Sequence, residues 1–217
     1  MPHVKRLVPL AALLLSGCIF GGGHTPPTDQ RRTGAPGPSA RQTQMCHADL
    51  KRIGVAFNPL PNRDRGGGCS TIGTVQLLDI GVPVTNLGAM RCGLARTFSG
   101  WARNAVAPAA RQILGSDLVK IETFGTYACR AVVGVASNRL SGHAIANAVD
   151  ISAFVLADGR RISVLDDWSS PDPQIRAFMR VIHSSACKRF GTVLSPDYNS
   201  AHRNHFHLED DGAHFCR

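Results

Sequence analysis

The stretch SGHAIANAVDIS, residues 141–152, places His143 seven positions before Asp150 in a run of small and apolar residues. On a single α-helix this spacing corresponds to a rise of about 10.5 Å, which is too large for both side chains to bind one metal ion. A loop that carries His143 and leads into a strand that carries Asp150 removes the difficulty, because the chain can then fold back. The segment therefore predicts a loop followed by a strand, and one half of a metal site.

The other half is expected near the C-terminus, in HRNHFHLEDD at residues 202–211. On a strand, His205 and His207 point to the same face of the sheet. Together with His143 and Asp150, His207 supplies three ligands and leaves a fourth position for water, as in catalytic zinc sites. A bound Zn²⁺ would lower the pKa of that water and polarise a substrate carbonyl. The alternative interpretation is that these side chains are structural polar groups or surface residues.

The chain begins with a segment typical of exported bacterial proteins. Two basic residues precede the apolar run 7–15, and Leu15-Ser16-Gly17-Cys18 resembles the lipoprotein cleavage box. We expect residues 1–17 to be a lipoprotein signal peptide and Cys18 to carry the lipid that anchors the protein to the membrane. The alternative is a plain secretory signal with an incidental cysteine. Ile19 favours a periplasmic protein anchored to the outer membrane over one retained at the inner membrane.

Composition divides the rest of the chain into a linker and one domain. Residues 18–45 are rich in Gly, Pro, Thr and Arg and show no apolar period, so they are expected to be a flexible linker. Residues 46–217 are long enough for a single core. The formal charge of +9 is compatible with nucleic-acid binding, but export argues against that partner. A basic surface suits anionic envelope polymers, or is simply a solvated surface rich in arginine. No feature of the sequence indicates an oligomeric state.

The cysteines support an oxidising compartment. Besides Cys18 the chain has six, an even number that predicts three disulfides. A zinc–thiolate site is the competing interpretation, but no CxxC pair supports it. Pairing between neighbours along the chain is expected, namely Cys46 with Cys69, Cys92 with Cys129, and Cys187 with Cys216.

The apolar periodicity predicts helices mixed with antiparallel strands, without repeats. Pro108 should kink or divide the second helix, and Asp172-Pro173 should begin the third. The predicted fold class is α+β, with a small antiparallel sheet flanked by helices. Helices are expected at 46–55, 94–114 and 173–187, and strands at 74–80, 118–123, 127–134, 148–156, 161–165 and in the HxH segment.

Several motifs together resemble a known family. They are Tyr127-x-Cys129-Arg130, Ser141-x-His143-Ala144-x-x-Asn147-Ala148-x-Asp150, Phe190-x-Thr192-Val193-Leu194 and His202-x-x-His205-Phe206-His207. On these motifs residues 46–217 resemble the bacterial extensin-like C-terminal domain family. That family is in turn similar to the zinc peptidases of the D-Ala-D-Ala metallopeptidase and hedgehog group, which cut peptidoglycan peptides. The resemblance implies their fold, a small antiparallel sheet with flanking helices.

The resemblance also implies roles for individual residues. His143, Asp150 and His207 would be the metal ligands, and His205 would act on the water or stabilise the oxyanion. Arg130 would hold a substrate carboxylate or carbonyl, or is a surface arginine. Two further residues are weighed in the same way: Ser141 as a substrate contact, and His202 as either an orienting partner of a ligand or an exposed loop histidine.

Three positions depart from the patterns of these relatives: Gly142, where many carry Glu, Ala146, often Gly in the wider peptidase group, and Asn204. Related peptidases use an acidic residue at the position of Asn204 as the general base, and an amide cannot take a proton. His205, or a carboxylate such as Glu209, would then do that work.

Two functions follow from these observations. The first is a lipid-anchored envelope protein that hydrolyses peptidoglycan peptides with a zinc ion, as a carboxypeptidase or an endopeptidase. The second is a peptidoglycan-binding or structural lipoprotein that keeps the fold with little or no hydrolysis, which the amide of Asn204 makes credible.

Overall fold

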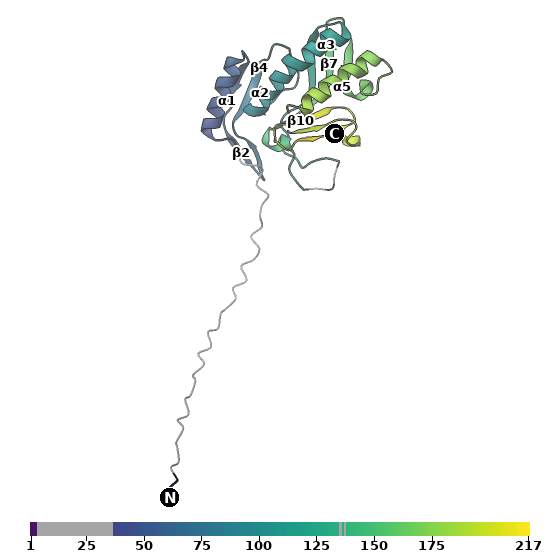
Figure 1. Cartoon of the computed structure of the whole chain (residues 1–217). Coiled ribbons are helices and arrows are strands. Elements are labelled where there is room, and N and C mark those ends of the chain that lie inside the picture. The colour runs from purple at the N-terminus through teal and green to yellow at the C-terminus, as the bar shows by residue number, and fades with distance from the viewer. Residues whose placement is uncertain (4–36, 135, 137) are drawn as a thin grey trace. The chain divides into compact units, whose positions relative to one another are not determined.

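The computed structural model describes residues 1–3, 37–134, 136 and 138–217 (Figure 1). Its helices and strands all lie in the compact unit Arg31–Arg217. Within the described residues, no helix combines the length and the hydropathy needed to cross a bilayer. The predicted signal peptide and the lipidation site Cys18 fall almost entirely outside the described residues.

The fold is α+β with small antiparallel sheets and helices, as predicted. The main sheet has the strand order β11-β9-β10-β7-β6, with β8 paired to β7, and only the pair β11–β9 is parallel. Two smaller antiparallel sheets have the orders β1-β4-β5 and β2-β3. The helical elements are α1 (Ala40–Arg52), α2 (Cys92–Trp101), η1 (Ala102–Val106), α3 (Ala107–Leu114), η2 (Gly142–Ile145), α4 (Val164–Asp167), α5 (Pro173–Cys187) and η3 (Ser200–His202). The strands are β1 (Ala56–Pro59), β2 (Arg63–Gly66), β3 (Cys69–Thr71), β4 (Thr74–Asp79), β5 (Met90–Arg91), β6 (Leu118–Gly125), β7 (Ala148–Leu156), β8 (Arg161–Ser163), β9 (Thr192–Leu194), β10 (Phe206–Glu209) and β11 (Phe215–Cys216).

Helix α1 begins earlier than predicted, at Ala40 rather than Cys46. Ser39 accepts a hydrogen bond from the amide of Gln42, and the Gln42 side chain accepts one from the amide of Ser39. This reciprocal pair is a capping box, which satisfies two amides that a helix start leaves unpaired. The prediction that the linker extends to residue 45 is therefore wrong for residues 40–45, which are helical.

The predicted helix over residues 94–114 is divided, as the position of Pro108 suggests. Helix α2 passes into the π-helical segment η1, and α3 follows with Pro108 in its first turn. Gly115, at φ 67°, ends α3 in the left-handed conformation that glycine adopts at little cost. Asp172 caps α5 by accepting hydrogen bonds from two amides of its first turn, as predicted.

The strand predictions were correct in the middle of the domain and failed at its loops. Strand β7 has the predicted bounds, 148–156. The strand predicted at 127–134 is wrong, because this segment contributes only the isolated bridge Ala131–Leu140. The short strand β9 was not predicted, and the chain after Ser163 turns into helix α4 instead of continuing as a strand.

A β-bulge in β7 sends its residues to the two faces of the sheet. Along β6, Glu122 pairs with Ala153 and the next residue, Thr123, pairs with Ile151, so Ser152 is the extra residue of β7. A bulge shifts the alternation of side chains by one position. For this reason Asp150 and Phe154 point to opposite faces although their spacing is even.

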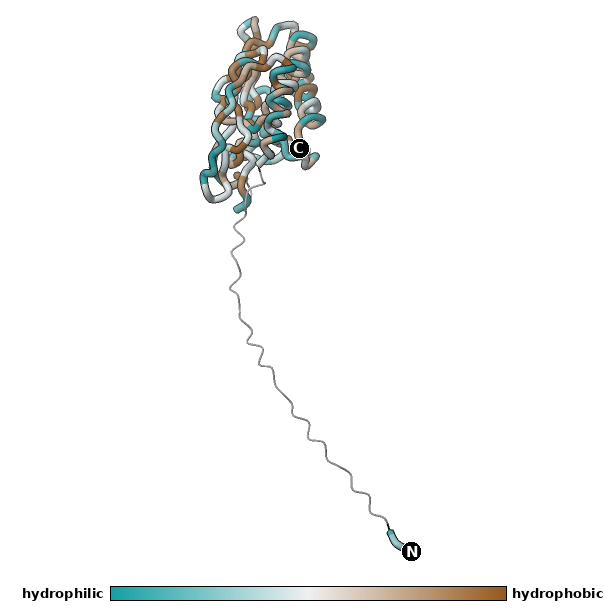
Figure 2. Tube along the Cα trace, turned by 90° about the vertical axis from the view of Figure 1, so that its left-hand side faces the viewer, coloured by the Kyte–Doolittle hydropathy of each residue, from teal (hydrophilic) through white to brown (hydrophobic). Residues whose placement is uncertain are grey.

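The core lies between the main sheet and helices α2, α3 and α5, which pack together (Figure 1). Trp101 of α2 packs edge-on against Phe154 of β7, and its indole Nε1–H donates to the carbonyl of Ile182 in α5 at 3.1 Å. Phe154 in turn contacts Phe178 of α5. Hydrophobic stretches accordingly run through both helices and strands of the folded unit (Figure 2).

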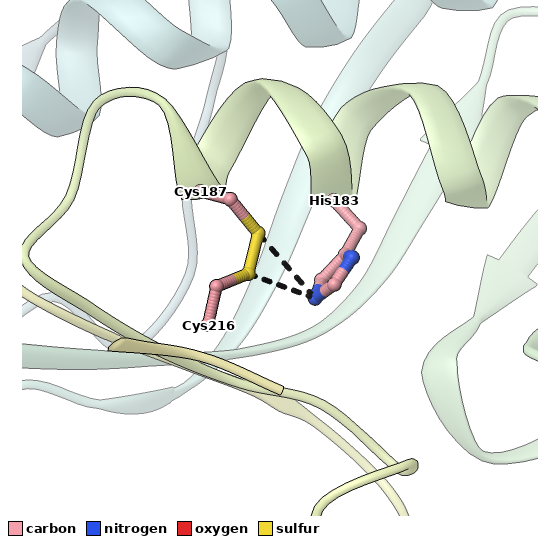
Figure 3. Close-up of side chains that lie close together, drawn as sticks. All are labelled: His183, Cys187 and Cys216. Atoms are coloured by element: carbon pink, nitrogen blue, oxygen red, sulfur yellow. Dashed lines mark hydrogen bonds between the residues drawn. A yellow bond between two sulfur atoms is a disulfide. The ribbon is translucent and has the colours of Figure 1, made fainter. Parts of the chain in front are cut away.

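Three disulfides are present, but two of the predicted pairings are wrong. The structure joins Cys46 to Cys92 and Cys69 to Cys129, with Cα–Cα distances of 6.0 and 5.6 Å. Tertiary packing explains both bonds. Helix α1 lies against α2, and strand β3 lies against η2, which carries His143. The third pair is as predicted: it ties α5 to the C-terminal strand β11, beside His183 (Figure 3). This bond joins Cys187 and Cys216.

Candidate functional site

A short 3₁₀-helix holds His143 at the entrance to β7. Ser141 caps this helix, η2, by accepting a hydrogen bond from the amide of His143 at 3.4 Å. Ala146 ends it at φ 54°, and its amide donates to the carbonyl of His143 at 3.0 Å. The chain then enters β7, which carries Asp150. A turn leading into a strand is what the spacing of His143 and Asp150 predicted.

The second segment reaches the same place from the neighbouring strand. His207 of β10 pairs directly with Asp150 of β7 in the antiparallel ladder, so both side chains stand on one face. His205 immediately precedes β10 and lies on the same side, with its Nε2 3.5 Å from Asp150 Oδ1. The two halves expected from the sequence therefore lie side by side.

Potential ligand atoms of three side chains lie close together. His143 Nε2 lies 3.1 Å from Asp150 Oδ2 and 3.2 Å from His207 Nδ1, and His207 Nδ1 lies 2.8 Å from Asp150 Oδ1. Zinc bonds of about 2.0–2.1 Å in tetrahedral geometry place neighbouring ligand atoms about 3.3 Å apart. The observed separations are close to that value. The side chains are thus placed as a three-ligand metal site requires.

The remaining ring nitrogen of each histidine is held by a hydrogen-bond acceptor. His143 Nδ1–H donates to the carbonyl oxygen of Thr126 at 3.1 Å, and His207 Nε2–H donates to Glu209 Oε1 at 2.6 Å. Such bonds fix the tautomer and aim the opposite nitrogen at the metal in known metal sites. Here they direct His143 Nε2 and His207 Nδ1 towards each other and towards Asp150.

Burial and charge make this cluster favourable for a cation. All three ligand candidates are at most 7% exposed. Burial would raise the pKa of Asp150, but hydrogen bonds and charge from His143 and His207 outweigh it and hold that pKa well below its usual range. For His207, burial opposes the proton, yet Asp150 and Glu209 raise its pKa to about 9. Two buried carboxylates therefore retain a positive charge at this position.

A cavity of about 320 Å³ adjoins the cluster on the side of His205 and His207. Its walls come from residues 130–133, 139 and 141, from β9 and β10, from the chain between them and from the C-terminal residues. Substrate-sized groups can therefore approach the ligand cluster from this side. The residues that line it are Arg130, Val132, Val133, Arg139, Ser141, Thr192, Leu194, Tyr198, His202, His205, His207, Glu209, Asp211, Ala213 and Phe215.

Asn204 sets the orientation of His205. Its side-chain oxygen lies 2.9 Å from His205 Nδ1, so this nitrogen donates and Nε2 is left as a proton acceptor facing Asp150 and the cavity. The ring of His205 also packs edge-on against the exposed ring of Phe124. Burial, ahead of the nearby charges, lowers the pKa of His205, which favours the neutral ring.

His202 is a buried residue of the site rather than an exposed loop histidine. Its Nδ1–H donates to Asn199 Oδ1 at 2.7 Å, and its ring contacts those of His205 and His207. Burial and the neighbouring histidines lower its pKa to about 4. His202, His205 and His207 also form a second possible ligand group, with atoms within 4.8 Å of one another. The first group is tighter and includes a carboxylate.

Arg130 and Ser141 both line the cavity. Arg130 Nη2 lies 4.0 Å from Asp150 Oδ2, and its side chain is 37% exposed, so the guanidinium can meet a ligand and the carboxylate at once. The neighbouring Cys129 is tied to β3, which restrains the backbone that carries Arg130. Ser141 is buried, and its hydroxyl caps η2.

Sequence reasoning missed the supporting contacts of the site. Glu209 was considered only as a proton acceptor, whereas it binds His207 in the structure. The spacing of His207 and Glu209 on one strand face was the available signal. The carbonyl of Thr126 left no signal, because any residue type supplies a backbone acceptor.

Comparison with known families agrees with the motif pattern. Residues 44–217 match the family described as Extensin-like protein C-terminus. The chain belongs to this extensin-like family. Neither a curated protein nor a solved structure matched the extensin-like chain.

Proposed function

We propose that this extensin-like protein is a zinc-dependent peptidase of the cell envelope that hydrolyses peptide bonds in peptidoglycan. The observation that supports a metal centre most strongly is the close approach of His143 Nε2, His207 Nδ1 and the two carboxylate oxygens of Asp150, with His143–Asp150, His207–Asp150 and His143–His207 distances of 3.1, 2.8 and 3.2 Å. The substrate class rests on the resemblance of the motifs to D-Ala-D-Ala metallopeptidases and hedgehog-type proteins, and so does the proposed likeness of fold.

The donor set suits zinc. Two imidazole nitrogens and one carboxylate are ligands that Zn²⁺ uses in catalytic sites, which keep a further position open. When bound, zinc supplies Lewis-acid chemistry, lowering the pKa of a water molecule and polarising a carbonyl. The ligand residues themselves are held ready by Thr126 and Glu209.

His205 is the proposed proton acceptor of the reaction. The hydrogen bond to Asn204 leaves the Nε2 lone pair of His205 directed at the site, where it can take a proton from water and return it to the leaving amine. Asn204, which cannot itself act as a base, thereby serves to orient the base. His205 would thus take the place of the acidic general base that related peptidases carry at the position of Asn204.

Arg130 is proposed to hold the substrate. A guanidinium is permanently charged and planar, and binds a carboxylate or carbonyl with two parallel hydrogen bonds. It lies in the cavity wall near Asp150, so a group bound there would be next to the ligand cluster. Ser141 lines the same wall. The protein would act at the periplasmic face of the outer membrane, held there by lipid on Cys18.

The competing function is a lipoprotein that binds peptidoglycan without cutting it. The observation that favours it is the amide at Asn204, since no carboxylate takes the general-base position expected from the related peptidases. In that case the cavity and Arg130 would serve binding alone.

Hydrolysis of muropeptides by the purified protein, with and without a chelator, tests the proposal. We expect one zinc per chain and cleavage that stops on chelation and returns when zinc is added back. Asp150→Asn should abolish cleavage, because it removes the one anionic ligand, while Asp210→Asn, at a carboxylate that directly follows β10 and lies outside the cavity lining, is the control. Binding of peptidoglycan without any chelator-sensitive cleavage would contradict the peptidase and support the binding protein.

A further inference from the structure

Glu209 is a partly buried carboxylate that the proposed ligand set does not use. It ends β10, and its side chain is 17% exposed. One oxygen, Oε1, accepts two hydrogen bonds: from His207 Nε2–H at 2.6 Å and from the amide of Gly142 at 3.2 Å. Gly142 lies 67 positions before Glu209 in the chain, so a single carboxylate oxygen joins two distant segments.

The geometry excludes two simpler roles for Glu209. It binds the Nε2 edge of the His207 ring, whereas Asp150 and His143 meet Nδ1 on the other edge. Glu209 is therefore not a fourth ligand beside His207 Nδ1. A role as general base is disfavoured as well, because Oε1 already accepts two hydrogen bonds and only Oε2 is left to take a proton. Burial would raise the pKa of Glu209, but the hydrogen bond and charge of His207 hold it below its usual range.

Gly142 provides the space that this contact needs. A Cβ atom at position 142 would lie 2.5–2.7 Å from three atoms of the Glu209 carboxylate group, closer than non-bonded atoms approach. Gly142 is also the residue before His143, and it begins η2. Any side chain at this position would push the carboxylate away from His207 or displace the turn that carries His143.

We propose that Glu209 and Gly142 act as a positioning pair that fixes the two histidine ligands relative to each other. Glu209 holds His207 with Nδ1 directed at the metal position, and its bond to the amide of Gly142 keeps η2, and with it His143, at the correct distance. This inference rests on the proposed metal centre. Carboxylate partners of ligand histidines typically contribute about 10- to 100-fold to metal affinity.

Zinc affinity of the purified protein, measured by competition with a chromophoric chelator, tests the pair. Glu209→Gln is expected to weaken zinc binding about 10- to 100-fold, because the neutral amide is a weaker acceptor for His207 Nε2–H. Asp211→Asn is the matched control: Asp211 lines the same cavity, but its carboxylate binds Thr192 and the amide of Ala213 instead of a ligand. Its zinc affinity should equal that of the wild type.

A double-mutant cycle isolates the role of Gly142. Gly142→Ala alone should weaken zinc binding, because the new methyl group meets the carboxylate. In a Glu209→Ala background the same change should cost nothing further, because the group that it would meet is gone. Nitrogen NMR of the zinc-bound imidazole supplies a second readout, because the His207 Nε2–H signal should shift in Glu209→Gln as its hydrogen bond weakens and stay unchanged in Asp211→Asn.

The outcomes separate the two proposals. If the wild type binds zinc and Glu209→Gln binds it equally well with an unchanged Nε2–H signal of His207, the positioning pair is wrong while the metal centre stands. Additive losses in the double mutant would likewise overturn the role of Gly142. If the variants weaken zinc binding but no peptide is cut, the pair stands and the peptidase fails. If the wild type binds no zinc, both fail.

Discussion

Two histidines, His207 of β10 and His183 of α5, lie on opposite faces of strand β10 and have opposite environments. On one face, His207 lies between the carboxylates of Asp150 and Glu209. On the other, Phe206 packs against Trp168 and the ring of His183, and His183 Nε2 lies 3.8 Å from each sulfur of the Cys187–Cys216 disulfide (Figure 3). These are ring and sulfur contacts without a carboxylate hydrogen bond to His183 among the described residues.

The contrast shows that the charged and hydrogen-bonding neighbours of a histidine, rather than its burial, decide in which direction its pKa shifts. Burial opposes a positive charge on both residues. Carboxylates overcome it at His207 and raise its pKa, whereas at His183 burial, reinforced by Arg180, lowers the pKa against a weaker opposing effect of Asp197. The face of β10 with His207, the ligand face, is therefore suited to bind a cation. The face with Phe206, the packing face, joins the sheet to α5.

The largest change in stability should come from removing a large buried side chain from the packing face. Phe206 is fully buried, and Phe206→Ala should reduce the free energy of unfolding by about 3–5 kcal/mol, through lost transfer energy and the cavity left behind. Urea denaturation measures this. Phe124→Ala is the control near the ligand face, because its ring is 58% exposed, and it should cost no more than about 0.5 kcal/mol. Similar losses for the two variants would remove the distinction between a packing face and a ligand face.

The sequence predicted which residues form the ligand cluster better than it predicted the strand geometry that separates the two faces of the sheet. Strand alternation, a local rule, predicted that His205 and His207 share a face, and the joint motif pattern predicted that His207 meets His143 and Asp150. The sequence of β7, AVDISAFVL, gave no sign of the bulge at Ser152, which depends on pairing with β6. Without that bulge, Asp150 and Phe154 would share a face.

The disulfide pairing shows the same limit. Cysteine number predicted three bonds, but pairing depends on which elements pack, and the contact of α1 with α2 is a tertiary event. Cys187–Cys216 was predicted correctly because the C-terminal strand returns to the helix end close to it in sequence. The same holds for Glu209: its type was visible in the sequence, but its role depends on Gly142, which is distant in the chain.

Acidification should reduce the free energy of unfolding through His183, which lies at the packing face. Because the folded protein lowers the pKa of His183, the unfolded chain binds the proton more readily. The contribution of neutral His183 is fully present above the unfolded pKa of about 6.5 and is lost as the pH falls through the lower pKa of the folded state. The slope from one such group is at most about 1.4 kcal/mol per pH unit.

The measurement is the free energy of unfolding of the wild type and of His183→Gln, with the disulfide intact, across that pH range. Groups facing His183 include Arg180, Asp197 and the backbone of Arg217, and all remain in the variant, so their own titration largely cancels in the difference. The stability advantage of the wild type over the variant should shrink as the pH falls. An advantage that grows on acidification would mean that His183 is charged in the fold, and that the two faces are not opposites.

The smallest effects concern the backbone at two helix ends, one at the site and one in the scaffold. Ala146 ends η2 at φ 54° and is fully buried, and Gly115 ends α3 at φ 67° with open space around it. Gly115→Ala should therefore cost about 1 kcal/mol, the penalty of a left-handed alanine less its gain in the unfolded state.

Ala146→Gly relieves the same strain of about 1–2 kcal/mol. It also loses a buried methyl group, worth about 0.8 kcal/mol, and adds about 0.5–1 kcal/mol of unfolded-state entropy. The net change in the free energy of unfolding should be close to zero, as thermal or urea unfolding of both variants would show. A gain of more than about 1 kcal/mol in Ala146→Gly would mean that packing does not compensate the turn beside His143, and that the site stores backbone strain which the scaffold avoids.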